Sequence, residues 1–264
     1  MRKAFFILTL PVLVTVNAQA AMTWRASPEI ATEQAHGGHS HRGPLEFYLR
    51  EGAGAEVLLL TPDLAARPLA VQGEKAVVKP TGAEGYHMLL ARRQLPGEEQ
   101  VTARYFFLPG KPSGHSPSEL LAAQISELEI VPAPLPREHW RYESSEEAVF
   151  QLRFSGAPLG GAAVRMITSN GTLLEAESDA QGMVRFGLPE DFAQVGAGRE
   201  ANAPGDFVVS AEHEAGGTRY VTTLNANYSV NPAHWQSTLG GGLSLAAGFL
   251  VGIVVLRPRK EQKA

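Results

Sequence analysis

Cysteine is absent from the 264-residue chain, which excludes disulfides, thiolate metal sites, iron–sulfur clusters and cysteine nucleophiles. The sequence also lacks a G-x-S-x-G nucleophile elbow, an H-E-x-x-H zinc helix, a Walker A loop and the glycine signature of dinucleotide-binding folds. Acidic pairs such as Glu98-Glu99 and Glu146-Glu147 stand in turn-like polar contexts and are more simply explained as solvated loops. We therefore expect no catalytic residues and no tightly bound cofactor.

Positive charge is also scarce, since 23 Lys and Arg stand against 27 Asp and Glu and give a formal net charge of −4. The two ends of the chain hold mostly basic residues, so the part between them is more acidic still. Proteins that bind nucleic acid present clustered positive charge. The composition therefore argues against nucleic acid as a partner.

An uncharged apolar run near the N-terminus has the form of a secretory signal peptide. Arg2 and Lys3 supply the positive region, residues 4–16 the apolar region, and Ala18-Gln19-Ala20 the small residues that a signal peptidase reads. We predict a signal peptide over residues 1–20 with cleavage after Ala20. An uncleaved N-terminal anchor is the alternative.

A second uncharged run, Leu239 to Leu256, is eighteen residues long, which is enough to cross a bilayer as a helix. Arg257-Pro258-Arg259-Lys260 follow directly. The positive-inside rule then predicts a cytoplasmic tail over residues 257–264 and a periplasmic location for the bulk of a single-pass inner-membrane protein. A buried core helix is the alternative.

Small residues recur every fourth position in the predicted span, which would let another helix approach closely. They are Gly240, Ser244, Gly248 and Gly252. This stripe predicts self-association or docking on the membrane subunits of a transporter, although ordinary glycine enrichment in membrane helices explains it equally well.

The region between the two runs has the composition of short strands and turns. Residues 21–43 contain few large apolar side chains and predict a flexible lead-in. Apolar, partly alternating runs begin at Leu45 and predict a first β domain over residues 44–131, with "SELEIVP" as its last strand. Within it, Ser116-Pro117-Ser118-Glu119 has the form of a helix capping box.

Three prolines in residues 132–136 predict an extended linker, after which a second β domain spans residues 137–231. Its turns include Asn170-Gly171, a two-residue hairpin signal, and Asp179-x-x-Gly182, in which the carboxylate caps a turn closed by glycine. Residues 232–238 form a stalk to the membrane. The predicted fold class is all-β, with two antiparallel β-sandwich (immunoglobulin-like) domains and one C-terminal transmembrane helix.

Several motifs in the second half resemble a bacterial family known as a domain of unknown function and associated with periplasmic components of nickel/cobalt uptake transporters. They are the "LEIVP" strand, the hairpin residues Gly156, Pro158, Leu159, Gly161, Ala162 and Val164, and the turn residues Asp179, Gly182 and Phe186. The hairpin is also similar to those of carboxypeptidase-regulatory-like sandwich domains. The resemblance implies a role in metal uptake. Family members commonly carry a histidine close to the mature N-terminus, whereas the predicted mature chain here has none before His36.

The predicted metal ligands are His36, His39 and His41, three imidazoles within the stretch "HGGHSHRG". Neutral imidazole binds nickel, cobalt, copper and zinc, and the choice among them depends on geometry. A histidine-containing spacer with adventitious affinity is the alternative. The remaining histidines are scattered singly and are expected to be packing or surface residues.

Two functional hypotheses follow. The first is a membrane-anchored periplasmic accessory that captures nickel or cobalt transiently for an uptake system, with copper and zinc as variants. The second is an envelope structural or adhesion-type sandwich protein that binds another protein or a polysaccharide.

Overall fold

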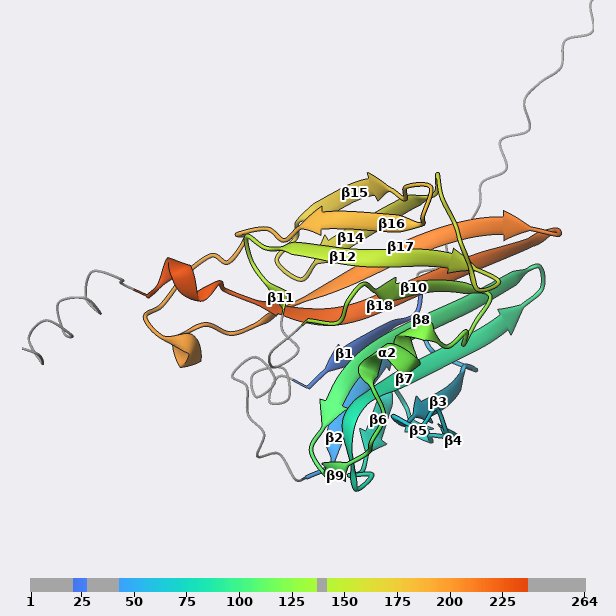
Figure 1. Ribbon diagram of the computed structural model, residues 1–264, viewed down its shortest axis with the longest axis horizontal. Coiled ribbons are helices and arrows are strands. Elements are labelled where there is room, and N and C mark those ends of the chain that lie inside the picture. The colour runs from blue at the N-terminus through green and yellow to red at the C-terminus, as the bar shows by residue number, and fades with distance from the viewer. Residues whose placement is uncertain (1–20, 28–42, 137–141, 237–264) are drawn as a thin grey trace, which may run out of the picture.

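The computed structural model describes residues 21–27, 43–136 and 142–236, and Figure 1 shows them as an elongated stack of β-sheets. Helical structure in these ranges is limited to α2 (Pro117–Ala122) and the 3₁₀ turns η1 (Arg199–Ala201) and η2 (Pro232–His234). The expectation of a mostly β protein with sandwich-like sheets is confirmed. None of the helices in the described ranges is long and apolar enough to span a bilayer. The predicted signal peptide and span 239–256 lie outside these ranges.

Among the described residues, a ten-stranded sheet runs through both β units. Its strands follow the order β15-β14-β17-β18-β8-β7-β3-β4, with β11 added to β18 and β9 to β7. Their bounds are β3 (Glu56–Leu60), β4 (Ala66–Pro68), β7 (Ala83–Leu95), β8 (Glu98–Leu108), β9 (Lys111–Pro112), β11 (Tyr142–Glu143), β14 (Ala163–Thr168), β15 (Leu173–Glu177), β17 (Gly205–Ala215) and β18 (Thr218–Ser229).

Two smaller sheets pack against this large sheet. One has the order β1-β2-β6-β5, and the other β10-β12-β13 with β16 beside β12. The first is made of β1 (Thr23–Ala26), β2 (Leu45–Arg50), β5 (Val71–Gln72) and β6 (Lys75–Val78). The second is made of β10 (Leu128–Pro132), β12 (Glu147–Phe154), β13 (Ala157–Pro158) and β16 (Met183–Gly187).

The small sheets cover opposite faces of the large one. Phe106 of β8 shares a core with Phe47 of β2. Leu224 of β18 pairs with Ala103 of β8, so its side chain points to the opposite face of the sheet from Phe106. There it shares a core with Phe150 of β12. Each half of the large sheet is therefore one layer of a separate sandwich.

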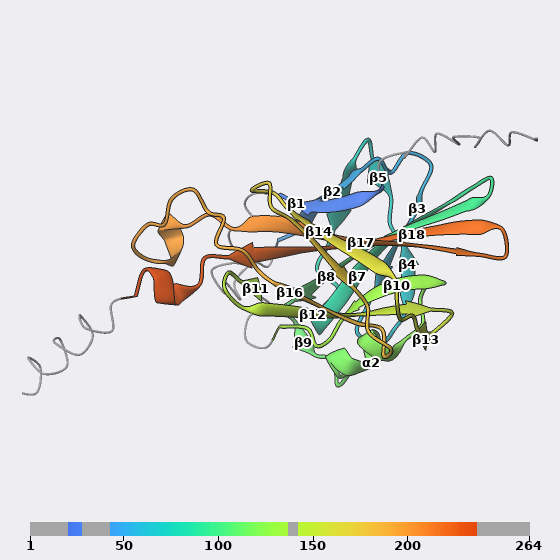
Figure 2. The same ribbon diagram turned by 90° about the horizontal axis from the view of Figure 1, so that it is seen from above.

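β8 and β18 join the two halves. They pair in parallel, from Glu98 opposite Arg219 to Arg104 opposite Asn225. In Figure 2, the long hairpins β7–β8 and β17–β18 extend in the same direction. Arg219 lies at the start of this pairing between Glu98 (2.5 Å) and Glu212 (2.8 Å). The two β units are thus continuous through backbone hydrogen bonds, whereas the sequence suggested two domains connected by a linker alone.

The prediction of a flexible lead-in over residues 21–43 is wrong for its first residues, which include strand β1. β1 pairs with β2, and the side chains of Met22 and Trp24 are each only 1% exposed. Trp24 donates its backbone N–H to Asn225 Oδ1 (2.7 Å), and Thr223 donates its hydroxyl to the Met22 carbonyl (2.6 Å). β1 is therefore held by residues of β18 that lie 201 positions later in the sequence. No local sequence pattern could indicate such a contact.

The strand "LEIVP" also lies in a different unit from the one expected. β10 pairs with β12 from Leu128 opposite Phe154 to Pro132 opposite Phe150, so it belongs to the second sandwich. Its Leu128 and Ile130 are buried in that sandwich's core. Pro132, the first residue of the predicted linker, is the last residue of this strand.

Local turn signals are largely confirmed. Ser116 caps α2 in a capping box with Glu119, as the motif predicts. Asp179 Oδ1 accepts hydrogen bonds from the backbone N–H groups of Gln181 (2.9 Å) and Met183 (2.8 Å). The β14–β15 hairpin also forms, but its loop is longer than two residues: Thr168 N donates to the Thr172 carbonyl.

Candidate functional site

The predicted metal ligands His36, His39 and His41 lie outside the described residues, so the metal site stays a prediction. In the described ranges, no three His, Cys, Asp or Glu side chains are grouped so that they could hold a metal ion.

The four described histidines lie apart and have structural partners. His115 lies 2.9 Å from Glu119, and His234 lies 3.3 Å from Glu190. His213 stacks edge-on against Phe154, with 4.6 Å between ring centroids. These contacts agree with the expectation that the single histidines are packing or surface residues.

His87, the fourth of these histidines, is fully buried on β7 and is held neutral. Its Nδ1 donates to the Gly85 carbonyl (3.0 Å), which leaves Nε2 to accept from the Thr81 hydroxyl (2.9 Å). Burial lowers the pKa of His87 because the charged imidazolium would lose its hydration. Both ring nitrogens are therefore already occupied, one by a backbone carbonyl and the other by a hydroxyl.

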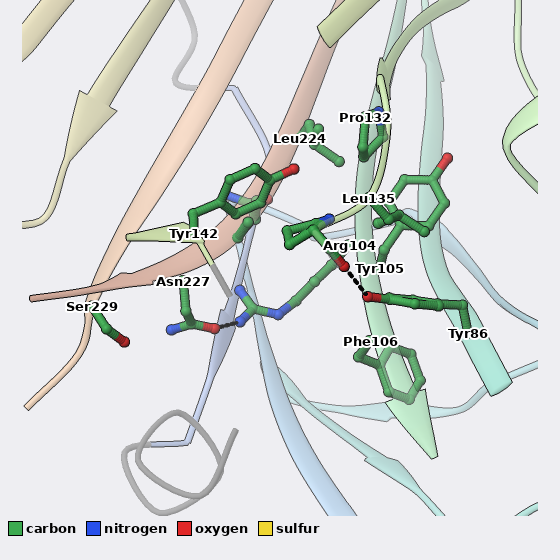
Figure 3. Close-up of a pocket in the computed structure, with 13 residues that line it drawn as sticks. Tyr86, Arg104, Tyr105, Phe106, Pro132, Leu135, Tyr142, Leu224, Asn227 and Ser229 are labelled. Carbon is green, nitrogen blue, oxygen red and sulfur yellow. Dashed lines mark hydrogen bonds between the residues drawn. The ribbon is translucent and has the colours of Figure 1, made fainter. Parts of the chain in front are cut away.

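A cavity lies where the two joined strands separate. The pairing of β8 with β18 ends at Arg104 and Asn225, and the cavity opens just beyond it, between these strands and the segment that follows β10. Its volume, measured as the space within which the centre of a water molecule fits, is about 40 Å³. Apolar walls come from Phe106, Leu135 and Leu224 (Figure 3). Both β units therefore contribute to one partly enclosed space.

Arg104 provides the charge in this cavity. It is 1% exposed, and its Nη2 donates to Asn227 Oδ1, as Figure 3 shows. Within the described residues, its Nε and Nη1 have no hydrogen-bond partner, and no acidic side chain forms an ion pair with it. Burial lowers the pKa of Arg104, and the charge of Asp206 opposes that shift. A guanidinium nonetheless remains protonated in proteins, so Arg104 is a buried cation.

Further donors line the same cavity without a partner in the described ranges. These groups are the Tyr142 hydroxyl, the Asn225 side-chain amide Nδ2 and the Ser229 hydroxyl. Burial raises the pKa of Tyr142, so its hydroxyl keeps its proton and remains a donor. Asn225 already uses its oxygen to accept from Trp24 N and the Thr102 hydroxyl (3.0 Å). The cavity therefore presents mainly hydrogen-bond donors.

Sequence reasoning did not single out Arg104. In "VTARYFFLPG", it stands at an alternating polar position that ordinarily faces solvent. The informative signal was that both faces of this strand carry apolar residues: Ala103 and Tyr105 on one face and Phe106 on the other. Such a pattern is typical of a strand buried on both faces, where a charged residue is exceptional.

An exposed apolar pair lies at the other end of the large sheet. Ile167 of β14 and Leu173 of β15 are Cα partners in the hairpin and are 51% and 56% exposed. Among the described strands, β15 forms backbone hydrogen bonds only with β14, although it also contacts β16 of the smaller sheet. Arg165 and Glu175, which pair two positions further along the hairpin, form an exposed ion pair at 2.8 Å.

Comparison with known proteins assigns no family. No protein-family model matches the chain, and no curated protein matches it.

Among solved structures, the chain is distantly similar to bacterial and animal β proteins. A Ca²⁺-stabilised adhesin with which an Antarctic bacterium binds ice shares 14% identity over 80% of this chain and 49% of its own, with a TM-score of 0.27. The D0-D1 domain of intimin shares 9% identity over 70% of this chain and 89% of its own length, with a TM-score of 0.26. A two-domain fibronectin type-III segment of chicken tenascin shares 8% identity over 71% of this chain and 93% of its own length, with a TM-score of 0.23. The chain thus spans about half the length of the adhesin.

Proposed function

We propose that the chain is a non-catalytic binding protein of the cell envelope that docks another protein on the β14–β15 edge. The observation that carries this proposal is the cross-strand pair of Ile167 and Leu173, whose side chains are 51% and 56% exposed. Adjacent exposed apolar side chains on an edge strand are typical of protein interaction sites. An extended segment of a partner would add to the edge as a further strand.

The charges on β15 favour a different protein over a second copy of this chain. Two copies of β15 paired antiparallel about Glu175 would place glutamates opposite each other and Leu173 opposite Glu177. Like charges directly opposite each other are destabilising, so self-pairing is disfavoured. A partner strand with apolar and basic residues is complementary.

The remaining expectations belong to the same proposal. Each β unit is taken as immunoglobulin-like, the signal peptide 1–20 as the export signal, and the span 239–256 as the anchor in the inner membrane. The periplasmic placement of the β units follows from that topology.

Site-specific photocrosslinking in cells that produce the full-length protein tests the docking edge. A photoreactive residue at position 173 is expected to give a defined crosslinked protein, which Ile167→Glu should abolish by adding charge to an exposed position. The matched control position is Val195, which is 47% exposed in a loop. The same products from positions 173 and 195, or no effect of Ile167→Glu, would contradict the proposal.

Transient capture of a transition metal for an uptake system is a second candidate, carried by the sequence His36-x-x-His39-x-His41 alone. The span would then dock on the transporter subunits through Gly240, Ser244, Gly248 and Gly252. Deleting residues 33–42 is expected to remove binding of Ni²⁺, Co²⁺, Cu²⁺ and Zn²⁺ in calorimetric titrations of the full-length protein. Unchanged affinity for all four ions would end this candidate.

A further inference from the structure

The cavity at the β8–β18 junction contains a positive charge that the described residues do not neutralise. Arg104 Nη2 is bound to Asn227, whose Nδ2 donates to Asp206 Oδ1 (2.6 Å), so the nearest carboxylate acts through an intervening amide. The Phe47 ring lies 5.8 Å from the guanidinium carbon and contributes a cation–π contact. Nε and Nη1 still lack acceptors among the described residues. A buried charge is costly unless it is paired and hydrogen-bonded.

Most of the other polar groups that line the cavity add donors. Tyr142 Oη, Asn225 Nδ2 and Ser229 Oγ have no partner within the described ranges. The Tyr86 hydroxyl, by contrast, is 3.4 Å from the Pro136 carbonyl, as drawn in Figure 3. Buried donors in native proteins are nearly always satisfied, by protein, water or an ion. These donors therefore need acceptors, which either water or a bound ligand supplies.

Size and wall chemistry narrow the occupant. The cavity volume is about 40 Å³, and by the same measure one water needs about 10–15 Å³. A group of about three to four heavy atoms therefore fits, and acetate has four. Phe106, Leu135 and Leu224 supply apolar contact beside the charge. A carboxylate on a short aliphatic chain meets all of these conditions, since it is small, carries one negative charge and accepts several hydrogen bonds.

We propose that this cavity binds a small aliphatic monocarboxylate, about the size of acetate, through Nε and Nη1 of the Arg104 guanidinium. The site lies between the two β units and depends on both. It is separate from the β14–β15 edge, so neither proposal depends on the other.

Nuclear magnetic resonance of the full-length protein tests the site with sodium acetate as the probe. The Arg104 Nε–H signal is expected to shift saturably during an acetate titration at constant ionic strength. Acetamide, which has nearly the same shape and no charge, should leave that signal in place. A saturable shift of equal size with acetamide, or no shift with acetate, would overturn the proposal.

Two variants separate binding from folding, with calorimetric titration of acetate as the measurement. Arg104→Met should weaken acetate binding at least about tenfold, because hydrogen bonds to a charged group are lost. Exposed Arg67→Met is the matched control and should bind as the parent does. Should Arg104→Met not fold, the titrations of the parent protein with acetate and acetamide decide the question on their own. Parental affinity in the folded cavity variant would overturn the proposal.

Discussion

Replacing Arg153 by methionine is expected to lower the free energy of unfolding by about 3–5 kcal/mol, because it leaves the carboxylate of Glu129 buried without a counter-charge. Arg153 of β12 and Glu129 of β10 are Cα partners, and their side chains are 10% and 7% exposed. Arg153 Nη2 lies 3.1 Å from Glu129 Oε2. Urea unfolding of the full-length protein measures the loss.

The second oxygen of Glu129 makes a conservative rescue available. Oε1 accepts from the backbone N–H groups of Ile125 (2.7 Å) and Ser126 (3.1 Å). Glu129→Gln keeps an acceptor there and removes the charge, so the double variant with Arg153→Met should regain more than half of the lost stability.

An exposed ion pair provides the control for this experiment. Arg165 and Glu175 lie 2.8 Å apart with side chains 64% and 60% exposed. Water and salt screen such a pair, and Arg165→Met should cost less than about 1 kcal/mol. Equal losses from Arg153→Met and Arg165→Met would show that burial of the β10–β12 pair carries no penalty.

The sequence predicted those features that neighbouring residues determine. Alternating apolar residues indicated most of the strands, and the motif Ser116-Pro117-Ser118-Glu119 indicated the start of α2. The carboxylate of Asp179 caps the turn that its spacing to Gly182 suggested. Each of these signals works over a few residues, so a single sequence contains all that is needed.

Features that depend on distant partners were not predicted. β10 was recognised as a strand, but its partner β12, which places Arg153 opposite Glu129, lies beyond the linker that the sequence suggested. The parallel pairing of β8 with β18 joins residues more than a hundred positions apart. That pairing creates the cavity around Arg104, so the candidate site could not be inferred before the two strands were seen together.

Trp24→Ala is expected to cost about 3–5 kcal/mol of unfolding free energy, the range for removing a buried aromatic side chain and leaving a cavity. Trp24 is 1% exposed in the core beneath β8, and its backbone N–H is bound to Asn225 of β18. Because β1 contacts both strands of the junction, its loss should loosen the connection between the two β units.

Trp235→Ala is the matched control, since Trp235 is only partly buried beside η2. It should cost no more than about 1 kcal/mol, as is usual for substitutions away from a packed core. Hydrogen exchange gives a second measurement: Trp24→Ala should speed exchange of the amides of β8 and β18 where these strands pair, whereas Trp235→Ala should not. Equal effects of the two variants would mean that β1 is a surface strand whose packing is dispensable. The larger effect of Trp24→Ala would instead establish the first strand as the element that secures the junction and the cavity beside it.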